Sequence, residues 1–204
     1  MKKKLPIGVS DFKEMIEEDY YYLDKSLFIK EVLDSGTKST LLPRPRRFGK
    51  TLNMSMLKYF FDKTDSEDRS YLFEGLEIWK EEHKLYREHM GRYPVVYLSF
   101  KDCKYDKWDE CIQSLRSLIS KEYYNHRYLL NSGCLEKYQE ETYNQILAGQ
   151  GEDFIYSIAL KELLEYLYRY HKEKVILLID EYDVPIQSAY FGKYYDEVIN
   201  FVRQ

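Results

Sequence analysis

Residues 44–51 of this chain, Arg-Pro-Arg-Arg-Phe-Gly-Lys-Thr, are of the types that bind phosphate groups. Gly49 lets the backbone approach a ligand closely, and the N–H groups at the start of the following helix aim partial positive charge at a polyphosphate. Lys50 would place an ammonium between the outer phosphates, and the Thr51 hydroxyl would complete the shell of a Mg²⁺ ion. The stretch therefore predicts a phosphate-binding loop of the Walker A kind. Its predicted nucleotide-binding residues are Arg44, Pro45, Arg46, Arg47, Phe48, Gly49, Lys50, Thr51 and Leu52.

The loop departs from the usual pattern at Arg44, because the motif commonly opens with glycine. Pro43 and Pro45 have fixed φ angles, and a residue that precedes proline is pushed into an extended conformation. We expect this stiff entry to replace the flexible glycine turn. Arg46 and Arg47 would either help to neutralise phosphate or remain solvated loop charges, and the sequence leaves both interpretations open.

A second pair of candidate residues, Asp180 and Glu181, follows the aliphatic run Val-Ile-Leu-Leu-Ile at residues 175–179. Such a run predicts a strand buried on both faces of a parallel sheet, and open α/β sheets bind ligands at the carboxyl ends of their strands. Asp180 would hold Mg²⁺ through water, and Glu181 would orient or deprotonate the attacking water, as in a Walker B motif. Alone, the pair would be interpreted as a polar strand end that meets solvent. Two motifs in the right order and context favour a nucleotide site.

The elements that must position these residues alternate between strands and helices. Strands are expected at about residues 38–43, directly before the loop, and at 93–100. The helix that follows the loop is expected at about 50–62. Together with the strand at 175–179, these segments predict an α/β fold with a parallel sheet and flanking helices.

Two further regions are expected to be helical. Residues 1–36 predict two helices, with Asp11 and Asp24 as caps and Gly36 as a stop. Residues 102–174 contain three amphipathic patterns and predict an all-helical crossover, much longer than the dozen or so residues that a parallel connection needs. The helices expected within this crossover span about 106–125, 135–148 and 153–171.

Composition narrows the range of partners. The 204 residues carry a net charge of −4 with 32% charged residues, so general attraction to nucleic acid or to an anionic membrane is not indicated. No apolar stretch approaches the roughly 18–20 residues needed to span a bilayer. The three cysteines are odd in number and lack metal-ligand spacing, which favours reduced thiols in a cytoplasm. Many of the 22 tyrosines are expected to lie half-buried on helices rather than to form a base-stacking platform.

The motifs resemble those of the AAA-ATPase-like proteins, a bacterial family that often carries a C-terminal PD-(D/E)XK-type nuclease-like domain. The resemblance rests on Pro-Arg-Arg-Phe-Gly-Lys-Thr at residues 45–51 and Leu-Ile-Asp-Glu-Tyr-Asp-Val-Pro-Ile at 178–186. Gly-Val-Ser-Asp-Phe at 8–12 and Tyr-Tyr-Leu-Asp-Lys-Ser at 21–26 are similar to the family's N-terminal stretch. The resemblance implies a P-loop NTPase of the additional-strand type that uses ATP and Mg²⁺. In related ATPases the segment that holds Tyr22, Asp24 and Lys25 contacts adenine, although ordinary cap and surface roles are expected for these residues here.

The expected organisation is a helical segment at 1–36 followed by a P-loop ATPase domain at 37–204, with the helical insertion at about 102–174. The sequence stops inside an amphipathic pattern, without the strand that would bring a sensor residue and without a downstream arginine finger. We therefore expect a domain truncated before the sensor strand, with weak ATP hydrolysis and a tendency to self-associate. The alternative is a nucleotide-dependent interaction module, with a protein partner and little or no turnover. GTP is disfavoured because no Asn-Lys-x-Asp motif follows Glu181.

Overall fold

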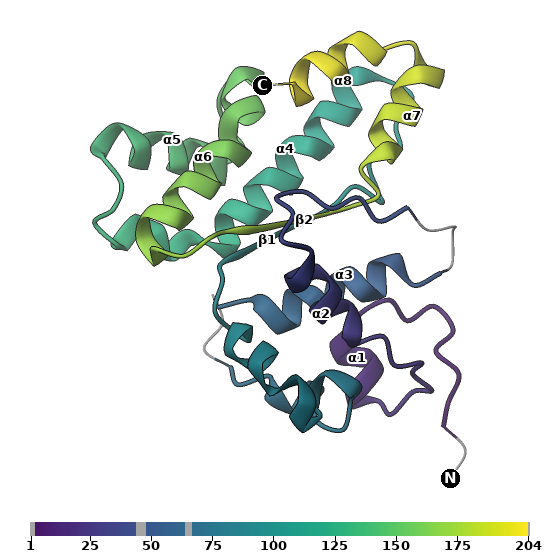
Figure 1. The fold of residues 1–204 in the computed structure, drawn as a ribbon. Helices are drawn as coiled ribbons and strands as arrows, with labels where there is room; N and C mark the ends of the chain where they lie inside the picture. Colours follow the sequence, from purple (N-terminus) through teal and green to yellow (C-terminus); the bar gives the residue numbers. More distant parts are fainter. Residues whose placement is uncertain (1–2, 44–47, 64–66, 204) are drawn as a thin grey trace. The chain divides into compact units, whose positions relative to one another are not determined.

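The computed structural model describes residues 3–43, 48–63 and 67–203. The chain divides into two compact units, Met1–Val95 and Val96–Gln204. Each unit is described by itself below, and Figure 1 labels their α-helices and strands.

The first unit is built from helices. Its described residues form three α-helices, which 3₁₀-helices follow. In chain order they are α1 (Phe12–Glu17), α2 (Leu27–Ser35), α3 (Lys50–Phe61), η1 (Ser70–Leu72), η2 (Glu77–Trp79) and η3 (Glu81–His89).

Caps explain where the first two helices begin and end. The carboxylate of Asp11 accepts a hydrogen bond from the Glu14 amide at 3.0 Å and starts α1, as expected. Gly36 ends α2 with a φ of 59°, a left-handed conformation that glycine adopts without strain. Asp24 was expected to cap α2, but the residue at that position is Ser26. Asp24 instead accepts hydrogen bonds from the amides of Ser26 and Glu77, each at 2.8 Å. Its carboxylate therefore joins its own turn to the start of η2.

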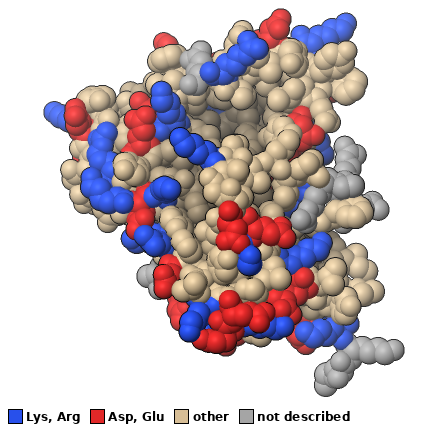
Figure 2. Space-filling view, in the orientation of Figure 1, with Lys and Arg blue, Asp and Glu red and all other residues tan. Residues whose placement is uncertain are grey.

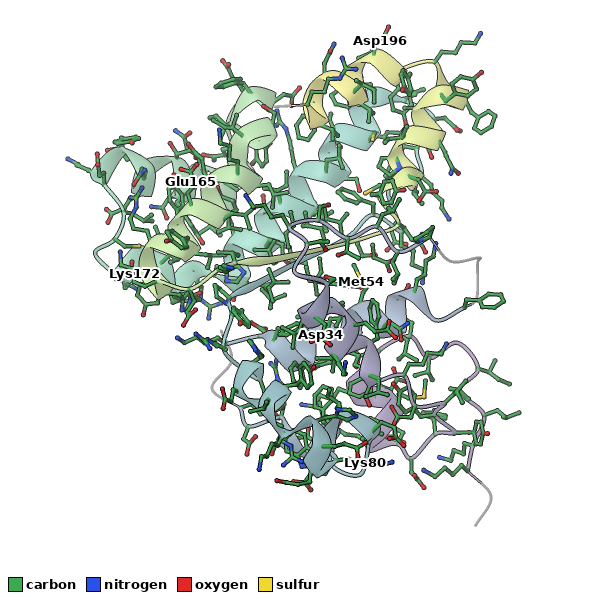
Figure 3. The ribbon with its side chains drawn as sticks, viewed as in Figure 1. Asp34, Met54, Lys80, Glu165, Lys172 and Asp196 are labelled. Carbon is green, nitrogen blue, oxygen red and sulfur yellow. The ribbon has the colours of Figure 1, made fainter. Side chains whose placement is uncertain are left out.

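Aromatic side chains form the core of the first unit. The rings of Phe12 and Phe60, on α1 and α3, each contact Phe73, with centroids 5.1 Å and 5.2 Å apart. All three residues are fully buried. Asp34, labelled on α2 in Figure 3, accepts a hydrogen bond from the Tyr86 hydroxyl of η3 at 2.9 Å. Long-range contacts of this kind hold the short helices in place.

The strand expected at residues 38–43 is not formed, and this prediction was wrong. Most of the segment is exposed, and the side chain of Leu41 is 65% exposed. A strand is stabilised by a paired neighbour and by a buried face. Pro43 also lacks the N–H group that a ladder would need. In the structure, the run Thr-Leu-Leu at residues 40–42 has neither a paired neighbouring strand nor a buried face.

The second unit contains a sheet and the helices that connect and follow its strands. Among the described residues the sheet has two parallel strands, β1 (Val95–Ser99) and β2 (Ile176–Asp180). Both strands were predicted, and so was the all-helical crossover between them. The helices are α4 (Trp108–Asn125), η4 (Arg127–Asn131), α5 (Lys137–Leu147), α6 (Asp153–His171), α7 (Asp183–Gly192) and α8 (Tyr195–Val202).

Buried tyrosines join the crossover helices. The Tyr123 hydroxyl of α4 donates to the Ala159 carbonyl of α6 at 2.8 Å, and the Tyr143 hydroxyl of α5 donates to the Tyr123 carbonyl at 2.8 Å. Burial raises the pKa of both phenols far above the ordinary value. Each phenol therefore fills the core with a ring while its hydroxyl finds a backbone partner, so these tyrosines are core residues rather than a ligand platform.

The surface carries charges of both signs. On the face seen in Figure 2, Lys and Arg groups are interspersed with Asp and Glu groups, in keeping with the small net charge of −4. None of the helices formed by the described residues combines the length and the apolar character that crossing a bilayer requires.

Candidate functional site

The predicted phosphate loop ends at the start of α3. Gly49 is the N-cap with a φ of 73°, and its carbonyl accepts the first helical hydrogen bond, from the Asn53 amide at 2.9 Å. Lys50 and Thr51 occupy the first turn, and both are half-buried. The first amides of a helix have no partner within the helix, so they are available to an anion.

The other predicted loop residues differ in how they are placed. Phe48 is 59% exposed, and Leu52 is half-buried on the first turn of α3. Residues 44–47, which are Arg44, Pro45, Arg46 and Arg47, lie outside the described residues.

Helix α3 is fixed against α1 by a polar network. Ser55 Oγ accepts a hydrogen bond from the Phe12 amide at 3.0 Å and donates to the Asp11 carboxylate at 3.0 Å. The Tyr59 hydroxyl donates to the same carboxylate at 3.0 Å. Burial and the neighbouring Asp11 charge raise the pKa of Tyr59 to about 12. The network sets the direction of α3, and therefore the direction in which its first amides point.

One cation beside this turn was not identified from the sequence. Lys25 Nζ lies 3.9 Å from the position that a Cβ atom would take on Gly49. Because Lys25 is 24 residues away in the chain, no local pattern connects the two residues. In the sequence, Lys25 and Ser26 contributed only to the family resemblance. That resemblance did not predict that Lys25 lies beside Gly49.

The predicted carboxylates stand at the end of β2. Asp180 is the last residue of the strand and is 4% exposed, and its carbonyl accepts a hydrogen bond from the Phe100 amide at 3.0 Å. Residues 175–179 were expected to be buried on both faces, but only Leu178 among them is buried and the others are half-buried. Within the described sheet β2 pairs with β1 alone, so its apolar residues are covered less than in a wide parallel sheet.

Glu181 turns the chain sharply from β2 into α7. Its φ is 53°, a left-handed conformation that costs a residue with a Cβ atom about 1–2 kcal/mol. Its carbonyl accepts the Val184 amide at 3.0 Å and closes the turn. The turn keeps the half-buried Glu181 directly beyond the strand. Strained non-glycine residues of this kind are found preferentially at functional sites.

The oxygen donors suit magnesium better than a softer metal. Thr51 offers a hydroxyl and Asp180 a carboxylate, and Mg²⁺ takes few protein ligands beside water and phosphate oxygens. The described residues contain no cluster of three or more His, Cys, Asp or Glu side chains that would enclose a metal. Thr51 belongs to the first unit and Asp180 to the second, and each residue is described within its own unit.

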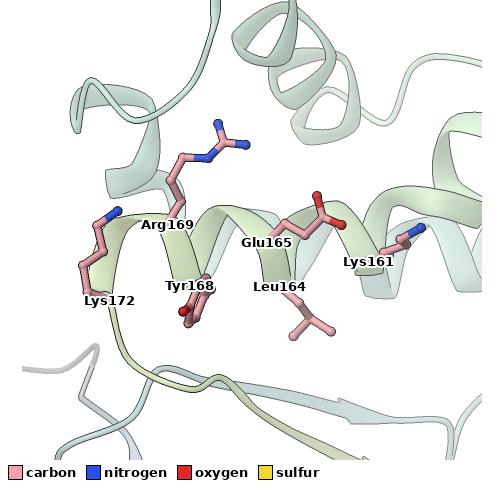
Figure 4. Close-up of a pocket in the computed structure, with 6 residues that line it drawn as sticks. All are labelled: Lys161, Leu164, Glu165, Tyr168, Arg169 and Lys172. Carbon is pink, nitrogen blue, oxygen red and sulfur yellow. The ribbon is translucent and has the colours of Figure 1, made fainter.

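One hollow of the surface involves none of these residues. It has a volume of about 540 Å³ and is lined by α6 and its C-cap residue, Lys172. Figure 4 shows that Leu164 and Tyr168 project from one side of this helix and Glu165 and Arg169 from the other. A hollow lined by a single helix is a surface groove and not an enclosed cofactor cavity.

Comparison with known proteins gives a family but no characterised relative. No solved structure matches the chain. A protein of Azotobacter chroococcum mcd 1, named "Uncharacterized protein in vnfD 5'region", is 29% identical over 191 residues, which are 91% of this chain. The chain spans 30% of the length of that relative. The family described as "Predicted AAA-ATPase" matches residues 6–204. The match covers nearly the whole sequence and confirms the resemblance drawn from the motifs, so the chain belongs to the AAA-ATPase-like family.

Proposed function

We propose that this chain binds Mg²⁺-ATP at the start of α3 and hydrolyses it slowly with the carboxylates that follow β2. The observation that carries the proposal is the beginning of α3. A left-handed glycine is followed by Lys50 and Thr51 in the first turn of a 12-residue helix. This arrangement presents the first amides of a helix, a cation and a hydroxyl at one place, as binding of a triphosphate requires. The residues predicted just before it, 44–48, would complete the loop.

Each residue would have a distinct role in the reaction. Lys50 would bind the outer phosphates, and Thr51 and Asp180 would hold Mg²⁺, which supplies neutralisation of the phosphate charge. Glu181 would orient a water molecule and accept its proton while the water oxygen bonds to the γ-phosphorus. The bond from that phosphorus to the bridging oxygen breaks at the same time, and ADP leaves with the electron pair.

A second candidate is a nucleotide-dependent interaction module with little or no turnover. The segment at 38–43 favours it, because a loop fed by a strand is held by the sheet and this segment forms no strand. A site whose entry segment is not held by a sheet would bind phosphate through the first amides of α3 and yet position the reacting atoms poorly. The protein partner of such a module would be recognised by the nucleotide-bound state.

Binding and turnover measured together distinguish the two candidates. Calorimetry with ATP and GTP, with and without Mg²⁺, reports affinity, and phosphate release reports hydrolysis. We expect ATP to bind in preference to GTP and Asp180→Asn to weaken the dependence of affinity on Mg²⁺. Hydrolysis that Glu181→Gln abolishes supports the enzyme, while tight binding without phosphate release supports the module. Absence of ATP binding would overturn both.

A further inference from the structure

Lys25 is held beside the N-terminus of α3 although it belongs to a distant part of the sequence. Its Nζ atom lies 3.9 Å from the Cβ position of Gly49, and the residue is half-buried. The Lys25 amide donates to the Tyr22 hydroxyl at 3.2 Å, and that hydroxyl contacts Met56 Sδ of α3 at 3.5 Å. The backbone that carries Lys25 is therefore attached to the helix whose first turn the ammonium approaches.

No carboxylate of the residues that the structure describes lies within ion-pair distance of the Lys25 ammonium. Among the described residues it makes no hydrogen bond and no ion pair, although lysines elsewhere in the first unit, such as Lys13 and Lys30, pair with carboxylates. A partly buried cation without a partner loses hydration and gains nothing in exchange. Placed where the helix amides already attract anions, it would be compensated by a bound anion.

Asn53 supplies a second and independent indication of a ligand. The residue is 1% exposed, and its Nδ2 atom has no acceptor among the residues that the structure describes. It lies one turn after Gly49 on the same face of α3, as the bond from its amide to the Gly49 carbonyl shows. Helical side chains tilt toward the N-terminus of their helix, so Asn53 stands on the side of α3 that leads to the first turn, where Gly49 lies beside Lys25. Buried donors without a partner are rare in proteins, and a bound water, ion or ligand is one way in which such a donor is satisfied.

From this geometry we propose that Lys25 is a second phosphate-binding cation of the nucleotide site, and that it selects nucleoside polyphosphates over monophosphates with the assistance of Asn53. The inference rests on the proposed function, because it assigns the ligand of the same helix N-terminus. A monophosphate presents one charged group, which Lys50 and the helix amides would satisfy. A di- or triphosphate presents further charged oxygens, which a second cation beside Gly49 would bind.

Two substitutions at Lys25 separate its charge from its packing. Lys25→Met keeps the apolar stem and removes the charge, while Lys25→Arg keeps the charge. Lys63→Met is the matched control, because Lys63 is exposed just beyond the other end of α3. Calorimetry with ATP, ADP and AMP gives the affinities, and the unfolding temperature shows that each variant folds.

We expect Lys25→Met to weaken ATP about tenfold to a hundredfold, as loss of a charge-assisted contact does. AMP affinity should change by less than about twofold, Lys25→Arg should retain most of the ATP affinity, and Lys63→Met should match the parent. Unchanged ATP affinity in Lys25→Met, with binding lost in Lys50→Ala, would overturn the role of Lys25 and leave the proposed function standing. A parent protein that binds no ATP would instead overturn the proposed function itself.

The unmodified chain provides a measurement that does not depend on folding of a variant. Acetylation of lysines by a water-soluble reagent, followed by mass spectrometry, gives the reactivity of each amine. Mg²⁺-ATP should protect Lys25 and Lys50 and leave Lys63 as reactive as before. Protection of Lys50 alone would contradict the assignment of Lys25.

Discussion

The carboxylate of Asp11 accepts a hydrogen bond from the hydroxyl of Tyr59 at 3.0 Å while also starting α1 through the Glu14 amide. With Ser55 as a third donor, at 3.0 Å, a single carboxylate joins the first turn of α1 to the middle of α3. The helix that carries Lys50 and Thr51 is therefore positioned by a residue of the N-terminal segment.

Asp11→Ala should destabilise the first unit by about 2–4 kcal/mol. The change removes a helix cap, worth roughly 1 kcal/mol, and leaves two partly buried hydroxyls without their charged acceptor. Urea unfolding measures the effect. Glu31→Ala is the matched control, since Glu31 is an exposed acidic residue of α2, and it should change stability by less than about 0.5 kcal/mol. Equal midpoints for the two variants would contradict the role of Asp11.

The stability of the first unit should decrease in alkali partly through Tyr59. Its pKa in the folded chain is raised from 10.0 to about 12, so the folded state keeps the phenol proton longer than the unfolded state does. The stabilising contribution is complete below pH 10 and is lost as the pH rises from 10 to about 12. Urea unfolding at a series of pH values should show a shallower decline for Tyr59→Phe than for the parent. Tyr168→Phe, on an exposed ring, should follow the parent curve.

Lys50→Ala should weaken ATP by about 1.5–3 kcal/mol, the range for a hydrogen bond to a charged group. The fold should be unaffected, because Lys50 is half-buried on the first helical turn and alanine favours a helix. Calorimetry tests the assignment when the variant is compared with Lys63→Ala. This control also removes one positive charge but leaves the site intact. Parental affinity in Lys50→Ala would show that the nucleotide binds elsewhere.

Substitutions at Glu181 should lower the rate of ATP hydrolysis without lowering the stability of the fold. Glu181→Gln keeps the shape of the side chain and removes the base, so ATP affinity should persist while phosphate release falls. Glu181→Gly should also lose turnover, yet keep or raise stability by up to about 1 kcal/mol, because glycine adopts the φ of 53° without strain. Lys172→Gly, at a φ of 56° outside the site, is the control: it should show the same effect on stability and parental turnover. Full turnover in either Glu181 variant would exclude this carboxylate as the base.

Elements with a strong local signal could be predicted from the sequence. Helix α6 spans Asp153–His171, as predicted, since its apolar residues recur at helical spacing and end near Lys172 in a left-handed cap. Strand β2 and the start of α3 were predicted on similar grounds, from an aliphatic run and from Gly49. Each of these signals lies within about 20 residues of chain.

Features that depend on distant contacts could not be predicted. The segment at 38–43 has the composition of a strand, but its formation depends on a neighbour that the local sequence does not specify. Asp24 was interpreted as a cap of its own helix, whereas half of its hydrogen bonding is to Glu77, 53 residues away. Lys25 was assigned an ordinary surface role for the same reason, since only the fold brings it beside Gly49.

The hydroxyl-to-carbonyl bonds of Tyr123 and Tyr143 have a consequence for the order of folding. Strand β1 ends at Ser99 and β2 begins at Ile176, so their pairing requires closure of a long chain segment. Helices α4, α5 and α6 pack on one another across shorter separations, and such contacts form faster than long-range strand pairing. We expect the crossover to condense first and to shorten the distance that the strands must span. Pulse-labelling hydrogen exchange should then protect amides of α4 and α6 before those of β1, and simultaneous protection would show that the sheet and crossover form in a single step.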